Sequence, residues 1–300
     1  MIGNFILSGR VQAIVVTTLS ALLSVLMLPF AYLISGSVLG LITLRKGAAI
    51  GLQTLVLSLL LLQVFFVVAS LPPQFGIAYA MVIWLPVWFA SAVLRLSEQQ
   101  GLLLSAVALL VISLIVAAYI TIDDVAHWWQ QWFDLMLVEA APPERLEQYQ
   151  ELMKAGAPMV NSMMAIALML NILIAVFCAR WWQSRLFNLG AFRKEFYALH
   201  LPPVILPVSG IMMLLVFTLA EQWQAMFRDI MVILMFMYLI QGISSVHRNV
   251  DKLKLSTAWI GAMYCLLVLI PQMGLLIACL GMTDVYISWR RKKIGSEDEL

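Results

Sequence analysis

Long apolar runs separated by short polar segments dominate the chain and predict a helical bundle that crosses a membrane. A helix rises about 1.5 Å per residue and the hydrocarbon core of a bilayer is about 30 Å thick, so one crossing needs about 20 apolar residues. A transmembrane β-barrel would instead show short alternating segments. We predict seven clear spans, at residues 12–31, 48–70, 76–94, 101–121, 159–179, 204–220 and 226–244. Three more apolar segments are ambiguous, at residues 32–44, 255–270 and 272–289.

Two apolar stretches are too long for one upright crossing, and we expect a proline to divide each of them. Residues 12–44 contain Pro29, and residues 255–289 contain Pro271. We therefore predict one full span followed by a short helix in the first stretch, and two segments in the second. The apolar stretch that begins at Gln12 exceeds the core of a cleavable signal peptide, which is about 7–15 residues long, so we expect it to stay in the membrane.

The basic residues predict the orientation of these spans, because cytoplasmic loops carry an excess of Lys and Arg. If the N-terminus is cytoplasmic and all ten segments cross, 15 of the 18 basic residues lie on the cytoplasmic side. The three on the outer side are Arg145, Lys154 and Arg228. We predict an all-α, polytopic helical integral membrane protein of the bacterial inner membrane. It would have about eight to ten membrane segments and both termini in the cytoplasm.

Composition agrees with this class and excludes several others. The 300 residues are 63% hydrophobic and 11% charged, with a mean hydropathy of +0.97. A soluble domain has about 45–50% apolar and about 25% charged residues, so a soluble enzyme, a disordered chain and a disulfide scaffold are excluded. The net charge of +2 comes with no large basic tract, and we expect no nucleic-acid partner. Three cysteines inside apolar runs show no metal-binding spacing: Cys178, Cys265 and Cys279.

One segment between the spans, residues 122–158, is predicted to be extracytoplasmic and to form amphipathic helices. It holds seven acidic residues, and its first part is rich in aromatic residues around Trp132, which suits the membrane surface. Pro142 and Pro143 predict the start of a second helix over residues 143–155. Gly156 and Pro158 are expected to end that helix before the next span.

A second segment, residues 180–203, is predicted to be a cytoplasmic interfacial loop. Basic and aromatic residues alternate in it, among them Trp181, Arg193 and Tyr197. This composition is typical of a helix that lies on anionic lipid. Simple anchoring to the membrane is the favoured interpretation, and docking of a cytoplasmic partner is the alternative.

The sequence shows no catalytic arrangement, so we expect a protein that is not an enzyme and needs no cofactor or metal. Polar residues inside the predicted spans are more informative, because a polar group in hydrocarbon is costly unless it is paired. They should face a cavity that binds a small molecule, or form interhelical hydrogen bonds worth about 1 kcal/mol each. The candidate cavity-lining residues are Gln53, Gln63, Asn161, Asn171 and Gln241.

Charged residues near the ends of the spans have a structural interpretation. Asp284 is expected to form a helix cap or a salt bridge with the basic cluster at 290–293. Arg228 and Asp229 stand at the outer start of a predicted span. We interpret them as an interfacial pair rather than as a site.

Small residues four apart predict close helix packing in the N-terminal part of the chain. These helices would pack either on each other or on a membrane protein partner. The candidate helix-docking residues are Ala13, Thr17, Ala21, Gly36, Gly40, Gly47 and Gly51. Among them, Ala13, Thr17 and Ala21 form one stripe in the first predicted span.

Two regions of the chain resemble the YybS-like family of bacterial membrane proteins, whose function is unknown. The first region is LMLPFAYLISGSVLGLITLRKGAAIGL at 26–52, and the second combines IQGISSV at 240–246 with LGMTDVYISWRRK at 280–292. The segment FRKEFYALHLPP at 192–203 and the helix expected near 143–155 also lie where that family has similar features. In fold, the family is distantly similar to the substrate-binding (S) components of energy-coupling-factor vitamin transporters and to the rod-shape protein MreD. The resemblance implies a membrane bundle that binds a small molecule. If the chain is similar to an S component, a partner would dock at the stripe Ala13, Thr17 and Ala21.

Two functional hypotheses follow. The leading one is a transport-related protein that is not an enzyme and holds a small molecule between its helices. The alternative is a membrane scaffold in cell-envelope or shape maintenance, with its docking surface on residues 180–203 or 122–158. Both place the chain in a lipid bilayer and allow for a membrane protein partner.

Overall fold

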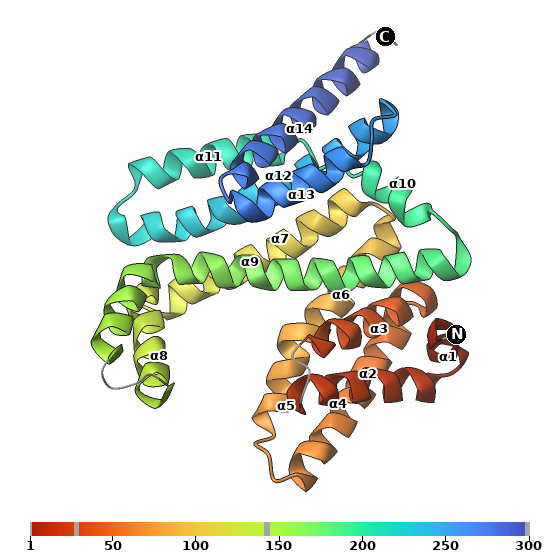
Figure 1. The fold of residues 1–300 in the computed structure, drawn as a ribbon, viewed down its shortest axis with the longest axis vertical. Coiled ribbons are helices and arrows are strands. Elements are labelled where there is room, and N and C mark those ends of the chain that lie inside the picture. Colours follow the sequence, from red (N-terminus) through yellow and green to blue (C-terminus); the bar gives the residue numbers. More distant parts are fainter. Residues whose placement is uncertain (1, 27–29, 141–144, 298–300) are drawn as a thin grey trace. The chain divides into compact units, whose positions relative to one another are not determined.

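The computed structural model describes residues 2–26, 30–140 and 145–297, and all regular elements in these ranges are helical (Figure 1). This confirms the predicted fold class. In the described part of the chain, five helical segments are long and apolar enough to cross a membrane. They are Ala48–Val68, Gln74–Ser97, Gln100–Thr121, Leu146–Phe187 and Trp223–Lys252. Shorter apolar helices lie at Arg10–Val25, Ile205–Thr218 and Ala258–Leu269.

Figure 1 labels the helices in chain order. They are α1 (Ile2–Ser8), α2 (Arg10–Leu26), α3 (Ala31–Lys46), α4 (Ala48–Val68), α5 (Gln74–Tyr79), the π-helical turn η1 (Ala80–Trp84), α6 (Leu85–Ser97), α7 (Gln100–Thr121), α8 (Val125–Ala140), α9 (Leu146–Phe187), α10 (Ala191–Tyr197), α11 (Ile205–Thr218), α12 (Glu221–Lys252), α13 (Ala258–Leu269) and α14 (Met273–Glu297).

We expected one domain over residues 1–300, and the chain forms two compact units. The first unit comprises residues 1–107, 169–201 and 246–255, and the second comprises residues 108–168, 202–245 and 256–300.

The division expected at Pro271 is confirmed. Helix α13 ends at Leu269 and α14 begins at Met273, with Pro271 between them. Proline has no backbone N–H and clashes with the preceding turn, which explains why this apolar stretch breaks there. The division expected at Pro29 lies outside the described residues, since the structure describes α2 as far as Leu26 and α3 from Ala31.

The predicted helix end at Gly156 and Pro158 is wrong, because α9 continues from Leu146 to Phe187 with Pro158 inside it. Long membrane helices tolerate a proline where neighbouring groups satisfy the freed backbone atoms. Arg228 donates a hydrogen bond to the carbonyl of Pro158 at 2.8 Å, although the carbonyl that a proline deprives of its donor is the one four residues earlier. The same helix takes in residues 180–187 of the segment predicted to be an interfacial loop, and α10 forms part of the remainder. The helix start predicted at Pro142 and Pro143 lies outside the described residues.

In the first unit, the small residues of α2 and α3 allow close packing of helices from the same chain (Figure 1). Side chains of the stripe Ala13, Thr17 and Ala21 are buried there. A Cβ added to Gly40 on α3 would lie 2.9 Å from the Cβ of Ala179 on α9. These helices therefore pack on each other within the first unit, and docking of a membrane protein partner stays a prediction.

The turn between α3 and α4 depends on Gly47 and Gly51. Gly47 has a φ of +108°, a conformation that side chains with a Cβ rarely adopt. A Cβ on Gly51 would lie 2.2 Å from the hydroxyl oxygen of Thr43. Glycine at both positions therefore lets α4 fold back closely against α3.

A buried hydrogen-bond chain joins the core helices of the first unit. The indole N–H of Trp84 donates to the hydroxyl of Ser35 at 2.8 Å, and that hydroxyl donates to the carbonyl of Thr17 at 2.8 Å. Trp84 is fully buried and packs with apolar side chains that include Leu62 and Phe66. Trp84, Ser35 and Thr17 thus link η1, α3 and α2.

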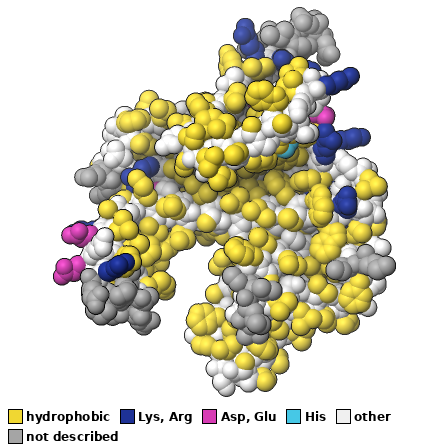
Figure 2. All heavy atoms as spheres, in the orientation of Figure 1, with side chains coloured by type: hydrophobic (Ala, Val, Ile, Leu, Met, Phe, Trp, Pro, Cys, Tyr) yellow, Lys and Arg dark blue, Asp and Glu magenta, His cyan; other side chains and the backbone are white. Residues whose placement is uncertain are grey.

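Hydrophobic side chains cover much of the face that Figure 2 shows, and many large apolar side chains are exposed. Side chains such as Val68 on α4 and Leu109 on α7 are 79% and 68% exposed. Large exposed apolar surfaces are unfavourable in water and mark membrane or protein contacts. Together with the long apolar helices, this surface indicates that a lipid bilayer surrounds the protein.

Candidate functional site

A carboxylate lies fully buried in the second unit, where Asp229 on α12 is 0% exposed. Tyr119 on α7 donates its hydroxyl hydrogen to Oδ2 of Asp229 at 2.9 Å. Asn161 on α9 donates its amide to the same oxygen at 2.7 Å, and the hydroxyl of Ser162 donates to Oδ1. Three helices therefore meet at one carboxylate, and each of its oxygens has a donor. These hydrogen bonds offset the cost of removing the carboxylate from water.

Arg228 and Asp229 do not form the interfacial pair that we inferred from the sequence. Successive residues on a helix point about 100° apart, so the two side chains face different surroundings. Arg228 is exposed and donates to the carbonyl of Pro158, whereas Asp229 faces the interior. The sequence reasoning also did not select Tyr119 or Ser162, which complete the cluster.

An open cavity of about 650 Å³ adjoins this cluster in the second unit. Tyr119 and Asn161 line the cavity and also hold Asp229, so they connect the cavity with the buried carboxylate. Its volume lies in the range of about 300–1,000 Å³ that is typical of small-molecule sites. Other charged and polar side chains that line it are Asp123, Asp124, Gln224 and Arg228.

Helix α8 begins at the edge of this cavity. The backbone N–H of His127 donates to the carboxylate of Asp124 at 2.9 Å, which caps the first turn of α8. Val125 and Ala126, at the start of the same helix, line the cavity with Asp124. The local sequence thus fixes the turn between α7 and α8 and holds acidic groups at the cavity wall.

The two C-terminal motifs meet in a second polar contact of the same unit. A Cβ added to Gly281 on α14 would lie 1.9 Å from the carbonyl oxygen of Tyr238 on α12, and one on Gly242 would lie 2.0 Å from the carbonyl oxygen of Ile277. Glycines therefore let the two backbones touch. One turn along α14 from Gly281, the carboxylate of Asp284 accepts a hydrogen bond from the amide of Gln241. The expected pairing of Asp284 with the cluster at 290–293 stays a prediction.

The five predicted cavity residues fall in both units. Gln53, which is exposed, Gln63 and Asn171 belong to the first unit, whereas Asn161 and Gln241 belong to the second. Of the five, Asn161 lines the cavity beside Asp229, and Gln241 forms an interhelical hydrogen bond. Gln63 packs beside Gly76, and its buried side-chain oxygen has no hydrogen-bond partner among the described residues. Joint lining of a single cavity by all five stays a prediction.

The aromatic and basic segment at 180–203 is fixed by contacts inside the first unit. Arg180 forms an ion pair with Glu195, and Arg193 forms one with Asp251 at 2.6 Å. A hydrogen bond to Tyr197, together with the charge of Asp251, raises the pKa of Arg193 above its ordinary value. The segment therefore presents a cationic and aromatic surface on a structured support.

One protein family matches this chain. The family described as "Predicted membrane protein (DUF2232)" matches residues 121–285, more than half of the chain. The matched region contains Asn161, Ser162 and Asp229 as well as the contact between α12 and α14. Neither the curated proteins nor the solved structures gave a match. The chain therefore belongs to the membrane protein family DUF2232.

Proposed function

We propose that this multi-pass membrane protein binds a small polar solute in the cavity beside Asp229 and does not transform it chemically. The observation that carries the proposal is the connection, through Tyr119 and Asn161, of a fully buried carboxylate with a cavity of about 650 Å³. Ionisable residues within membrane segments are costly, and they typically mark pathways or sites for ions and substrates. A purely structural contact between three helices would not require a charge.

The groups around the cavity indicate the class of solute. Carboxylates of Asp123 and Asp124 and the guanidinium of Arg228 line the same cavity, together with the amides of Asn161 and Gln224. A zwitterionic molecule, with an ammonium and a carboxylate group, complements both signs of charge. We therefore propose that the solute is a small zwitterion of the size of an amino acid.

Binding can be tested on the full-length protein in detergent. Thermal unfolding followed by tryptophan fluorescence would be measured with a panel of the natural amino acids, and any hit would be titrated by calorimetry. We expect at least one of them to raise the melting temperature of the wild-type protein, because a ligand that binds only the folded state stabilises it.

Two asparagines on α9 provide matched variants for the same titration. Asn161→Ala should weaken binding about tenfold or more, since it removes a cavity amide and a donor to Asp229. Asn171→Ala, on the part of α9 in the first unit, should leave the affinity unchanged. If no amino acid stabilises the protein, or if both variants weaken binding equally, the binding function is refuted and the scaffold alternative gains support.

We further propose a transport-related role in the bacterial inner membrane, with both termini in the cytoplasm. The resemblance to the S components of energy-coupling-factor transporters and the 15-to-3 division of the basic residues support this proposal. Arg228 lies on the predicted outer side, so the cavity would open outward. In a cysteine-free background, a cysteine at Asp123 should react with an impermeant maleimide in intact cells, and one at Lys252 should not. The reverse pattern would refute this orientation.

A further inference from the structure

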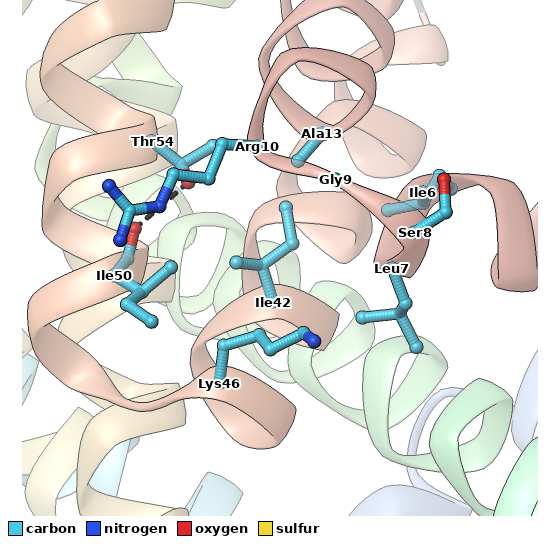
Figure 3. Close-up of a pocket in the computed structure, with 10 residues that line it drawn as sticks. All are labelled: Ile6, Leu7, Ser8, Gly9, Arg10, Ala13, Ile42, Lys46, Ile50 and Thr54. Atoms are coloured by element: carbon cyan, nitrogen blue, oxygen red, sulfur yellow. Dashed lines mark hydrogen bonds between the residues drawn. The ribbon is translucent and has the colours of Figure 1, made fainter.

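Two cations, Arg10 and Lys46, line a small cavity of about 150 Å³ in the first unit, and Figure 3 shows their charged ends on different sides of it. Arg10 begins α2 and Lys46 ends α3, and apolar residues such as Ile6 and Ile42 fill the rest of the wall. Figure 3 shows the side chain of Arg10 extending toward Ile50 and Thr54 on α4. The dashed line marks the bond from the Thr54 hydroxyl to the carbonyl of Ile50. The cavity thus has an apolar wall and a cationic rim.

Among the residues that the structure describes, no anion is paired with these two cations. Neither Arg10 nor Lys46 forms an ion pair or a hydrogen bond through its side chain with any residue that the structure describes. The sequence holds no Asp or Glu before Glu98, so α1 to α6 carry only positive charges. Positive side chains that line one cavity without an acidic neighbour favour binding of an external anion.

An apolar groove continues from this cavity along α2 and α4. A second cavity, of about 510 Å³, shares Arg10, Ile50 and Thr54 with the first and includes Ile14 and Leu57. A third cavity, of about 330 Å³, shares Ile14 and Leu57 with the second and reaches Val64 on α4. The groove therefore has a cationic residue at one end and mostly apolar side chains along the rest of its walls.

The length of the groove fits a lipid chain. From Ile50 to Val64, α4 advances 14 residues, or about 21 Å. One leaflet contributes about 15 Å of hydrocarbon, half of the bilayer core. The groove therefore accommodates a headgroup and the acyl chain of one leaflet, whereas a free anion would fill only its cationic end.

We propose that the groove between α2 and α4 binds a phospholipid with an anionic headgroup, whose phosphate lies between Arg10 and Lys46 and whose acyl chain lies along Ile14 and Leu57. The phosphate would accept hydrogen bonds from both cations. This site belongs to the first unit and involves none of the residues around Asp229, so either proposal can fail without the other.

Native mass spectrometry of the full-length protein in detergent would test this proposal. The protein would be titrated with phosphatidylglycerol and with phosphatidylcholine that carries the same acyl chains. We expect one molecule of phosphatidylglycerol to bind at about tenfold lower concentration than phosphatidylcholine. Equal binding of both lipids would show only unspecific lipid contact and would overturn the proposal.

Two variants, each with a matched control, test separately the contacts to the lipid headgroup and to the acyl chain. The double variant Arg10→Gln/Lys46→Gln should abolish the preference for phosphatidylglycerol, whereas Arg145→Gln/Lys252→Gln, which removes two exposed cations outside the groove, should keep it. Leu57→Trp should obstruct the groove and weaken binding, and Leu109→Trp, at an exposed position of α7, should not.

Inorganic phosphate separates a lipid site from a simple anion site. At millimolar concentration it should displace little of the bound phosphatidylglycerol, because it makes no contacts along the apolar groove. Complete displacement by phosphate, or loss of the lipid preference in both double variants, would overturn the proposal.

Discussion

Replacement of Asp229 by alanine tests the candidate site most directly. The substitution removes the acceptor shared by Tyr119, Asn161 and Ser162 and leaves three donors around a small void. Tyr119 and Asn161 line the cavity, so water can replace the lost acceptor for both of them. Ser162 is buried, and its hydroxyl would lose its acceptor without access to water.

The expected loss in the free energy of unfolding follows from these three hydrogen bonds. A buried donor left without an acceptor costs about 1–3 kcal/mol, and hydrogen bonds between membrane helices average about 0.6 kcal/mol. With the full penalty at Ser162 and the smaller value at the two hydrated donors, Asp229→Ala should lower the free energy of unfolding by about 2–4 kcal/mol. Asp229→Asn should cost about 1 kcal/mol, because its remaining oxygen still accepts and the amide of Asn161 can turn to accept from the new donor.

Unfolding in mixed micelles of increasing SDS content, followed by tryptophan fluorescence, would measure these differences. Asp134→Ala on α8 provides the control, since Asp134 takes no part in the cluster. The expected order of stability is wild type and the control, then Asp229→Asn, then Asp229→Ala. If Asp229→Ala unfolds at the same SDS content as the wild type, the carboxylate does not hold the three helices together and the reasoning fails.

Three further predictions concern packing and can use the same unfolding assay. Gly281→Ala should destabilise the protein by about 3 kcal/mol or more, because the new Cβ would overlap a carbonyl of α12, whereas Gly261→Ala, with open space around it, should be neutral or stabilising. Gly47→Ala should cost about 1–3 kcal/mol through backbone strain, and equal stability would show that the turn rearranges freely. Trp84→Phe should cost about 1–2 kcal/mol by removing the hydrogen bond to Ser35, and an unchanged transition would contradict the role of that bond.

Sequence reasoning located the helices well, because apolar length and proline carry strong local information. Helix α4 occupies residues 48–68 where a span was predicted at 48–70, and the break at Pro271 is present. Pro158 has the same chemistry but does not end its helix. A proline either ends a helix or is accommodated inside it. Which of the two happens depends on the helix around the proline and on neighbouring groups, and the local sequence shows neither.

Contacts between helices were harder to predict, since they depend on which glycine meets which carbonyl. The motifs around Gly242 and Gly281 belong to one C-terminal pattern but lie nearly 40 residues apart in the sequence, which does not show that their helices touch. The structure explains their association, because each glycine contacts the backbone of the other helix. The same contact explains why Gln241 pairs with Asp284. A polar residue predicted to line a cavity can thus form a hydrogen bond with a neighbouring helix instead.

The phase of α12 shows that the position of Asp229 could have been deduced. The buried positions of this helix include Met226, Ile230, Ile233 and Met237, which recur at intervals of three or four residues. Asp229 lies three residues after Met226 and four residues before Ile233, so it falls on the buried face of the helix. Arg228 lies one residue out of this register and is exposed. Adjacency in the sequence suggested an ion pair, but helical periodicity separates the two charges and directs the carboxylate inward. Helical phase is therefore the better guide when a charged residue begins an apolar span.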